Sequence, residues 1–189
     1  MKKLKIGFAI TGSYCTFKSA LIAMEKLVKN GHEVFPIFSQ SVGEDTRFFK
    51  AQDFRYNVIK ICGNKPIDTI VAAEPIGPLK SFDVLIVAPC TGNTLAKLAN
   101  SITDTPVLMA AKAHIRNDRP LVLAVSTNDA LSGSAKNIGS LLNLRNVFFV
   151  PMRQDDPQAK ARSVVASFDM IEATLLSAIK GQQIQPIFI

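Results

Sequence analysis

The sequence predicts an α/β domain in which a parallel sheet lies between two layers of helices. Short, continuously apolar runs alternate along the chain with segments whose apolar residues recur at helical spacing. Runs that lack a polar residue at every second position are typical of parallel strands buried on both faces. The chain has 189 residues, of which 48% are hydrophobic and 20% charged, and this fits one globular domain over residues 1–189.

The strands are expected where the apolar runs lie. These runs cover residues 4–11, 32–38, 83–88, 121–125 and 147–150, with a weaker one at 58–62. The runs at 4–11 and 83–88 are expected at the centre of a sheet of five or six strands, because they are apolar on both faces.

The helices are expected between these strands. The first one ends at Asn30-Gly31, a common signal for a helix C-terminus. Helical spacing predicts helices over residues 14–30, 46–52, 67–73, 92–100, 105–115 and 131–142, and a long amphipathic helix over 158–180. The tail at 182–189 is left unassigned.

Charge and cysteine content narrow the class of protein. The net charge is +7, but the lysines and arginines are dispersed, which disfavours nucleic acid and is compatible with a small anionic ligand. Three widely spaced cysteines, without a CxxC pair, support neither a disulfide framework nor a metal site, and they indicate a reducing cytoplasm. No apolar stretch reaches the roughly 20 residues that span a membrane.

Ligands of such sheets bind at the carboxyl ends of the strands, so the loops that follow the strands are the candidate sites. In the first loop, Gly12 permits close approach of the backbone and Ser13 offers a hydroxyl at a helix N-terminus, where anions bind. A capped turn without a ligand explains this loop equally well. Ser39 begins the second loop, which alone is typical of a solvated turn.

The third loop carries the strongest local signal. Pro89 closes an apolar strand, and Thr91, Asn93 and Thr94 crowd the start of the next helix. So many polar side chains exceed what one helix cap needs, which favours a ligand site. Lys97 follows one turn later.

The fourth loop, Ser126, Thr127 and Asn128, is polar at the same edge of the sheet, and Asp129 is expected to cap the following helix. Cys15 and Cys90 are interpreted as ordinary small buried residues. Neither histidine has an obvious catalytic partner nearby in the sequence, so no catalytic residue is identified.

Residues 88–104, APCTGNTLAKLANSITD, resemble the APxTxNTxAKxAxGxxD segment of the flavoprotein family that includes phosphopantothenoylcysteine decarboxylase and the peptidyl-cysteine decarboxylases. The Thr11-Gly12-Ser13 turn matches that family's N-terminal TGS. The resemblance covers most of the chain and implies a three-layer Rossmann-like or flavodoxin-like fold, flavin mononucleotide (FMN) as cofactor and a trimer-based homo-oligomer. The residues it implies for FMN are Gly12, Ser13, Ser39, Pro89, Thr91, Asn93, Thr94, Ser126, Thr127 and Asn128.

Within the family, Gly92 and the segments 128–133 and 151–157 resemble a branch of oxidoreductase subunits. This likeness implies a small dicarboxylate substrate and a dinucleotide-binding partner subunit. Because cationic side chains bind carboxylates, the candidates for the substrate are Lys97, Arg116, Arg119 and Arg153. At least one of the three arginines is expected to face the flavin pocket, from this chain or from a neighbouring copy.

The sequence departs from the decarboxylases of the family at two places. Residues 73–78, AEPIGP, contain no histidine where those enzymes carry a catalytic one, and only Asn128 remains of their PxMNxxM segment. Cysteine decarboxylation is therefore disfavoured. The alternatives that stay open are another flavin-dependent decarboxylase of this fold and a non-catalytic accessory subunit of a dehydrogenase.

Overall fold

The computed structural model describes residues 3–47 and 49–189. A seven-stranded sheet runs through its centre, in the order β2-β1-β3-β4-β7-β6, with β5 paired to β4 as well. The strands are β1 (Lys5–Ile10), β2 (Glu33–Phe38), β3 (Val84–Cys90), β4 (Leu121–Thr127), β5 (Val147–Phe149), β6 (Met152–Asp156) and β7 (Lys160–Ala166). The pairs among β1 to β5 are parallel, whereas β7 is antiparallel to β4 and to β6.

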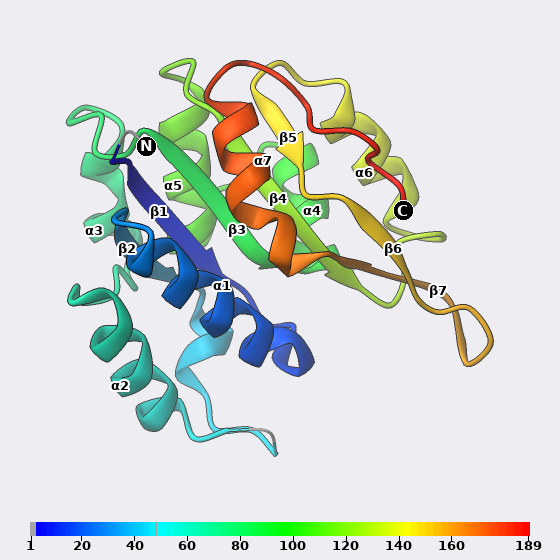
Figure 1. Ribbon diagram of the computed structural model, residues 1–189, viewed down its shortest axis with the longest axis horizontal. Coiled ribbons are helices and arrows are strands. Elements are labelled where there is room, and N and C mark those ends of the chain that lie inside the picture. Colours follow the sequence, from blue (N-terminus) through cyan, green and yellow to red (C-terminus); the bar gives the residue numbers. More distant parts are fainter. Residues whose placement is uncertain (1–2, 48) are drawn as a thin grey trace.

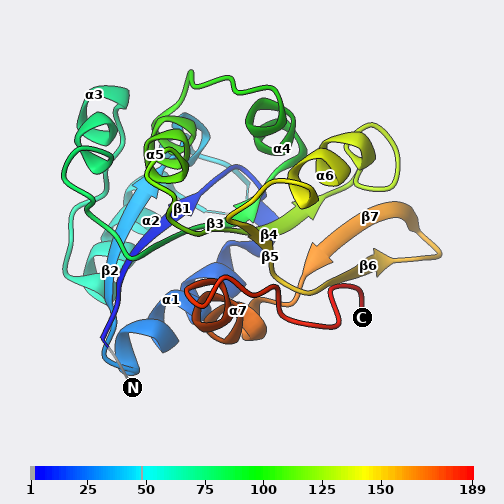
Figure 2. The same cartoon turned by 90° about the horizontal axis from the view of Figure 1, so that it is seen from above.

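Helices cover both faces of the sheet, as Figures 1 and 2 show. One face carries α1 (Phe17–Lys29), α2 (Ala51–Cys62) and α7 (Ile171–Ala178). The opposite face carries α3 (Ile70–Ala73), α4 (Gly92–Ala99), α5 (Pro106–Ile115) and α6 (Ala135–Leu142). The predicted three-layer α/β class is confirmed. The sheet has seven strands rather than the five or six predicted, and it is mixed rather than wholly parallel, because β6 and β7 add antiparallel pairs. None of the described helices is long and apolar enough to cross a membrane.

Two apolar cores follow from this layering. Ile6 and Phe8 of β1 point to the α1 and α7 side, while Leu85 and Val87 of β3 point to the α4 to α6 side, and all four are fully buried. Burial of each such side chain contributes about 1.5–3 kcal/mol. Because successive side chains enter opposite cores, the interior strands need apolar residues at every position.

The prediction of one long helix over 158–180 is wrong. These residues form β7, a short 3-10 turn at Phe168–Met170, and α7. The apolar residues Val164 and Val165 continue the helical spacing of α7 in the sequence, but they enter opposite cores as strand residues do. Pairing of β7 with the carboxyl half of β4 covers an edge that would otherwise be open. The β6–β7 hairpin projects from the body of the molecule (Figure 1).

The prediction of a strand at 58–62 is also wrong, because these residues are the last part of α2. Their β-branched composition suggests a strand, but Phe54 and Val58 share one helix face that packs into the α1-side core. The helix ends at Gly63, which adopts the left-handed conformation of a C-terminal cap. Of the helix expected over 46–52, Phe48 lies outside the described residues, and α2 begins only at Ala51. The helix expected over 131–142 starts later, at Ala135.

Candidate functional site

Two neighbouring cavities lie over the carboxyl ends of β1 to β4, with volumes of about 350 and 570 Å³. They share Gly12, Tyr14 and Thr91 and therefore form one continuous groove. The groove lies where the strand order changes direction. After β1 the chain first adds β2 on one side of β1 and then adds β3 on its other side. Such a switch in strand order is the usual ligand position of open α/β sheets.

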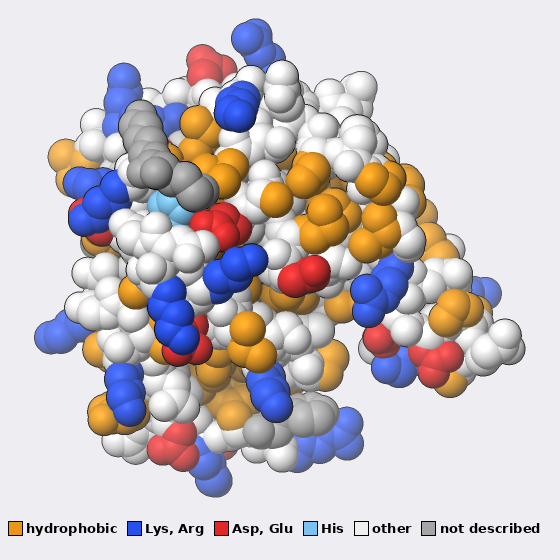
Figure 3. Space-filling view, in the orientation of Figure 1, with side chains coloured by type: hydrophobic (Ala, Val, Ile, Leu, Met, Phe, Trp, Pro, Cys, Tyr) orange, Lys and Arg blue, Asp and Glu red, His pale blue; other side chains and the backbone are white. Residues whose placement is uncertain are grey.

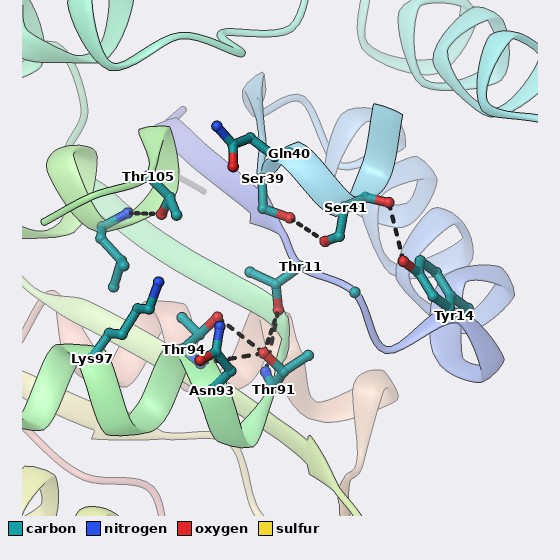
Figure 4. Close-up of a pocket in the computed structure, with 12 residues that line it drawn as sticks. Thr11, Tyr14, Ser39, Gln40, Ser41, Thr91, Asn93, Thr94, Lys97 and Thr105 are labelled. Carbon is teal, nitrogen blue, oxygen red and sulfur yellow. Dashed lines mark hydrogen bonds between the residues drawn. The ribbon is translucent and has the colours of Figure 1, made fainter. Parts of the chain in front are cut away.

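The first cavity is rich in hydroxyl groups, as Figure 4 shows. On one side of it, Ser39 Oγ and Ser41 Oγ lie 2.8 Å apart. On the other side, Thr91 Oγ1 and Thr94 Oγ1 lie 3.0 Å apart. The complete lining is Thr11, Gly12, Tyr14, Ser39, Gln40, Ser41, Thr91, Asn93, Thr94, Lys97, Thr105 and Leu108.

Two helix N-termini border this cavity. Thr91 caps α4 by accepting a hydrogen bond from the Thr94 N–H at 3.3 Å, and Thr105 caps α5 by accepting one from the Leu108 N–H at 3.2 Å. Partial positive charge gathers at helix N-termini, so the cavity attracts an anion without a dedicated cation. Thr105 was not among the predicted residues, although a threonine before a proline-led helix is a recognisable capping signal.

Thr11 ties the first loop to the third. Its Oγ1 donates to the Pro89 carbonyl at 2.8 Å and accepts from the Thr91 N–H at 3.2 Å. Pro89 is not among the residues that line either cavity, so its place is in the scaffold beneath the site. A Cβ atom added at Gly12 would lie 2.9 Å from Ser41 Oγ, so glycine is what lets the first two loops approach this closely.

The second cavity lies between the first and fourth loops and the projecting hairpin. Ser13 Oγ and Ser126 Oγ lie 2.8 Å apart at its floor. Its lining is Gly12, Ser13, Tyr14, Cys15, Thr16, Arg47, Thr91, Ser126, Thr127, Asn128, Asp155, Lys160, Ser163, Val164 and Val165. The hairpin residues were missed because this segment was predicted as a helix. The signal that could have found them is the Asp155-Asp156-Pro157 turn followed by β-branched residues.

Asp129 holds the fourth loop together rather than capping α6 as expected. Its Oδ1 accepts from Thr127 Oγ1 at 2.6 Å and from Ser134 Oγ at 3.0 Å. Ser134 is the residue that precedes α6. A Cβ atom at Gly92 would lie 2.7 Å from an oxygen of each of these three side chains. Gly92 therefore allows the start of α4 to pack directly on this loop.

The predicted cations are separated by the fold. Lys97 lines the first cavity, with its Nζ 2.7 Å from Asp104 Oδ2. Arg116 and Arg119 follow α5, which runs back across the sheet, so they lie at the amino ends of the strands. Arg119 there donates to the Phe82 carbonyl. Arg153 lines a third cavity, between α1 and the hairpin. Within one chain, none of these three arginines is brought to the groove.

Both histidines are buried away from the groove. His114 Nε2 lies 3.0 Å from the Pro120 carbonyl oxygen, and burial lowers the pKa of His114 to about 4. His32 Nδ1 accepts a hydrogen bond from the Leu4 N–H at 3.3 Å. Their burial and their hydrogen bonds to the backbone give them structural roles.

The cysteines differ in exposure. Cys90 is fully buried, and burial raises the pKa of its thiol above the ordinary range, which makes it unreactive. The interpretation of Cys15 as a buried residue is wrong, because it is exposed at the second cavity, with its Sγ 3.8 Å from Ser13 Oγ. Among the described residues, no group of three His, Cys, Asp or Glu side chains could hold a metal ion.

Along its whole length, the chain is similar to proteins that have a name and a family. A family model described as flavoprotein matches residues 1–176. The B subunit of dipicolinate synthase from Bacillus subtilis (strain 168) is 45% identical over 190 residues, covering 100% of this chain and 95% of that protein. The crystal structure of the corresponding subunit from Bacillus halodurans superposes with a TM-score of 0.91 at 41% identity, covering 98% of this chain and 96% of that one. The FMN-dependent cysteine decarboxylase SpaF shares the fold, with a TM-score of 0.65 at 15% identity over 95% of this chain and 97% of that one.

Proposed function

Because the chain belongs to the flavoprotein family, we propose that it is the B subunit of a dipicolinate synthase and binds FMN. In this proposal it takes part in oxidising dihydrodipicolinate to dipicolinate during sporulation, in the cytoplasm of the mother cell. The observation that carries the proposal is the groove of neutral donors at the carboxyl ends of β1 to β4, in a chain that matches subunits of that name from end to end.

The residues of the groove fit FMN. The first cavity offers hydroxyls and two helix N-termini, which suit a phosphate group. The second cavity continues from it and is large enough for a ring system. In this proposal Gly12, Ser39, Thr91 and Thr94 hold the phosphate end. The residues proposed for the cofactor as a whole are Gly12, Ser13, Ser39, Thr91, Asn93, Thr94, Ser126, Thr127 and Asn128, with Pro89 supporting them from below.

The division of labour between cofactor and protein follows from this arrangement. Bound FMN supplies the hydride-accepting chemistry. The residues of this chain orient the cofactor through hydroxyl and backbone N–H groups, and they place a dicarboxylate beside it. Aromatisation of the product favours the oxidation, so the protein needs no general acid comparable to the histidine of the decarboxylases.

The proposed partners are the dinucleotide-binding A subunit of dipicolinate synthase and further copies of this chain in a trimer-based homo-oligomer. The name of the Bacillus subtilis relative, a B subunit, implies a partner subunit for that protein. Arg116, Arg119 and Arg153 lie outside the groove of their own chain, so they reach a substrate only if a neighbouring copy presents them.

Anaerobic mixing of the FMN-loaded protein with dihydrodipicolinate tests the reaction. We expect the flavin absorption band to bleach, either with this chain alone or after the dinucleotide-binding partner is added. Persistence of the band in both experiments would remove the direct oxidation and leave the accessory-subunit alternative. Release of carbon dioxide in place of dipicolinate would instead identify a decarboxylase.

A second prediction concerns the FMN site itself. Thr94→Ala is expected to weaken FMN binding about tenfold to a hundredfold, because it removes a hydrogen bond of roughly 1.5–3 kcal/mol to the charged phosphate. Ser13→Ala, in the second cavity, is expected to weaken it about twofold to tenfold, because it removes a hydrogen bond of roughly 0.5–1.5 kcal/mol to a neutral acceptor. Quenching of flavin fluorescence on titration measures the affinity. Ser140→Ala, on the exposed side of α6, is the matched control. Wild-type affinity in both site variants would contradict the assignment.

A further inference from the structure

Each end of the groove carries a lysine that is paired with an aspartate, Lys97 with Asp104 and Lys160 with Asp155. Lys97 lies in the first cavity, beside the hydroxyls and helix N-termini that suit a phosphate. In the second cavity the projecting hairpin supplies Lys160 and Asp155, and Arg47 lines the same space. The helix N-termini and hydroxyls of the first cavity are sufficient to bind a phosphate, so the amine donors of Lys160 in the second cavity can bind another anion.

The hairpin is held firmly enough to position Lys160. Its strand β7 pairs with β4 through Ser126↔Val165 and Thr127↔Val164. The buried Ser163 also donates from Oγ toward Asn128 Oδ1 at 3.3 Å, which joins the hairpin to the fourth loop. Lys160, the first residue of β7, pairs with Asp156 of β6 and lines the second cavity, on the hairpin that projects from the body in Figure 3.

Asp155 fixes the direction of the Lys160 side chain. Its Oδ2 lies 2.7 Å from Lys160 Nζ, and this contact raises the pKa of Lys160, so the amine stays protonated. An ammonium group has three donors, and Asp155 occupies one of them. The other donors remain able to bind a second carboxylate at the cavity.

We propose that Lys160 is a specificity-determining residue that binds one carboxylate of the substrate in the second cavity. The inference rests on the proposed function, since it assigns a donor to the dicarboxylate of that reaction. Within one chain, Lys160 of the hairpin thus takes the substrate-binding role that the sequence suggested for Arg116, Arg119 and Arg153. Lys160 touches the substrate and takes no part in the transfer of hydride.

Binding of dipicolinate, the stable dianionic product, tests the role without relying on turnover. Calorimetric titration of the FMN-loaded protein is expected to show about tenfold weaker binding for Lys160→Gln, the loss of one charge-assisted contact near solvent. Lys160→Arg is expected to stay within a few fold of wild type, because it keeps the positive charge. Lys136→Gln, an exposed lysine of α6, changes the net charge equally and should bind as wild type does. FMN affinity should be the same in all four proteins.

The possible negative results distinguish the role of Lys160 from the proposed function. Wild-type dipicolinate affinity in Lys160→Gln, in a protein that binds dipicolinate and bleaches with dihydrodipicolinate, would overturn the role of Lys160 and leave the proposed function standing. An equal loss of FMN affinity in Lys160→Gln would overturn it too, because the lysine would then serve the cofactor. Absence of both dipicolinate binding and bleaching in the wild type would overturn the function and this inference together.

Discussion

Acidification from pH 6.5 to pH 4 is expected to cost the folded protein about 3 kcal/mol through His114 alone. The side chain is buried, and desolvation lowers its pKa to about 4 from an ordinary value of 6.5. In the unfolded chain His114 therefore binds a proton below pH 6.5, whereas in the folded chain it binds one only near pH 4. The stabilisation is complete above pH 6.5, falls as the pH drops, and stops changing below the folded pKa.

His114→Gln isolates this contribution, because glutamine can still donate to the Pro120 carbonyl but does not titrate. Urea unfolding of both proteins at pH 7 and pH 4 gives the free energies of unfolding. The difference between wild type and variant should shift by about 3 kcal/mol in favour of the variant at pH 4. Carboxylates titrate in both proteins and cancel in the comparison. Parallel pH profiles would show that His114 titrates normally in the folded state.

Gly92→Ala is expected to destabilise the fold by about 1–3 kcal/mol, the usual effect of overpacking. The added Cβ would lie 2.7 Å from Asp129 Oδ1, Thr127 Oγ1 and Ser134 Oγ, so the hydrogen bonds among these side chains must rearrange. The start of α4 carries Thr91 and Thr94 and would move with it. FMN affinity should therefore fall in the same variant.

Gly139→Ala is the matched control, since it makes the same change inside α6, where no atom lies within 4 Å of the added Cβ. This variant should be as stable as wild type or more stable by roughly 0.5–1 kcal/mol, because alanine favours a helix. Urea unfolding and fluorescence titration with FMN measure both effects. Equal stability of the two alanine variants would show that the fourth loop accommodates the methyl group without strain.

The local sequence pattern was sufficient to predict several features of this protein. Unbroken apolar runs predicted the interior strands, because a strand covered on both faces cannot tolerate a polar residue at every second position. The polar residues around Gly92 predicted a helix start with more polar groups than a cap needs, and Thr91, Asn93 and Thr94 all line the first cavity. The third-loop motif also indicated the family, which full-length similarity shows.

The parallel part of the sheet, the polar loops and the family were thus readable from the order of residues along the chain, whereas the antiparallel strands β6 and β7 were not. Which side chains share the groove was not, because this depends on pairing between distant segments: Ser13 meets Ser126 across 113 positions, and β7 becomes a strand by pairing with β4. The helical spacing that continues from α7 into residues 158–166 concealed the hairpin and with it Lys160. Arg116 and Arg119, by contrast, follow α5 and precede β4, so the alternation of parallel strands and helices already implied that they lie at the amino ends of the strands.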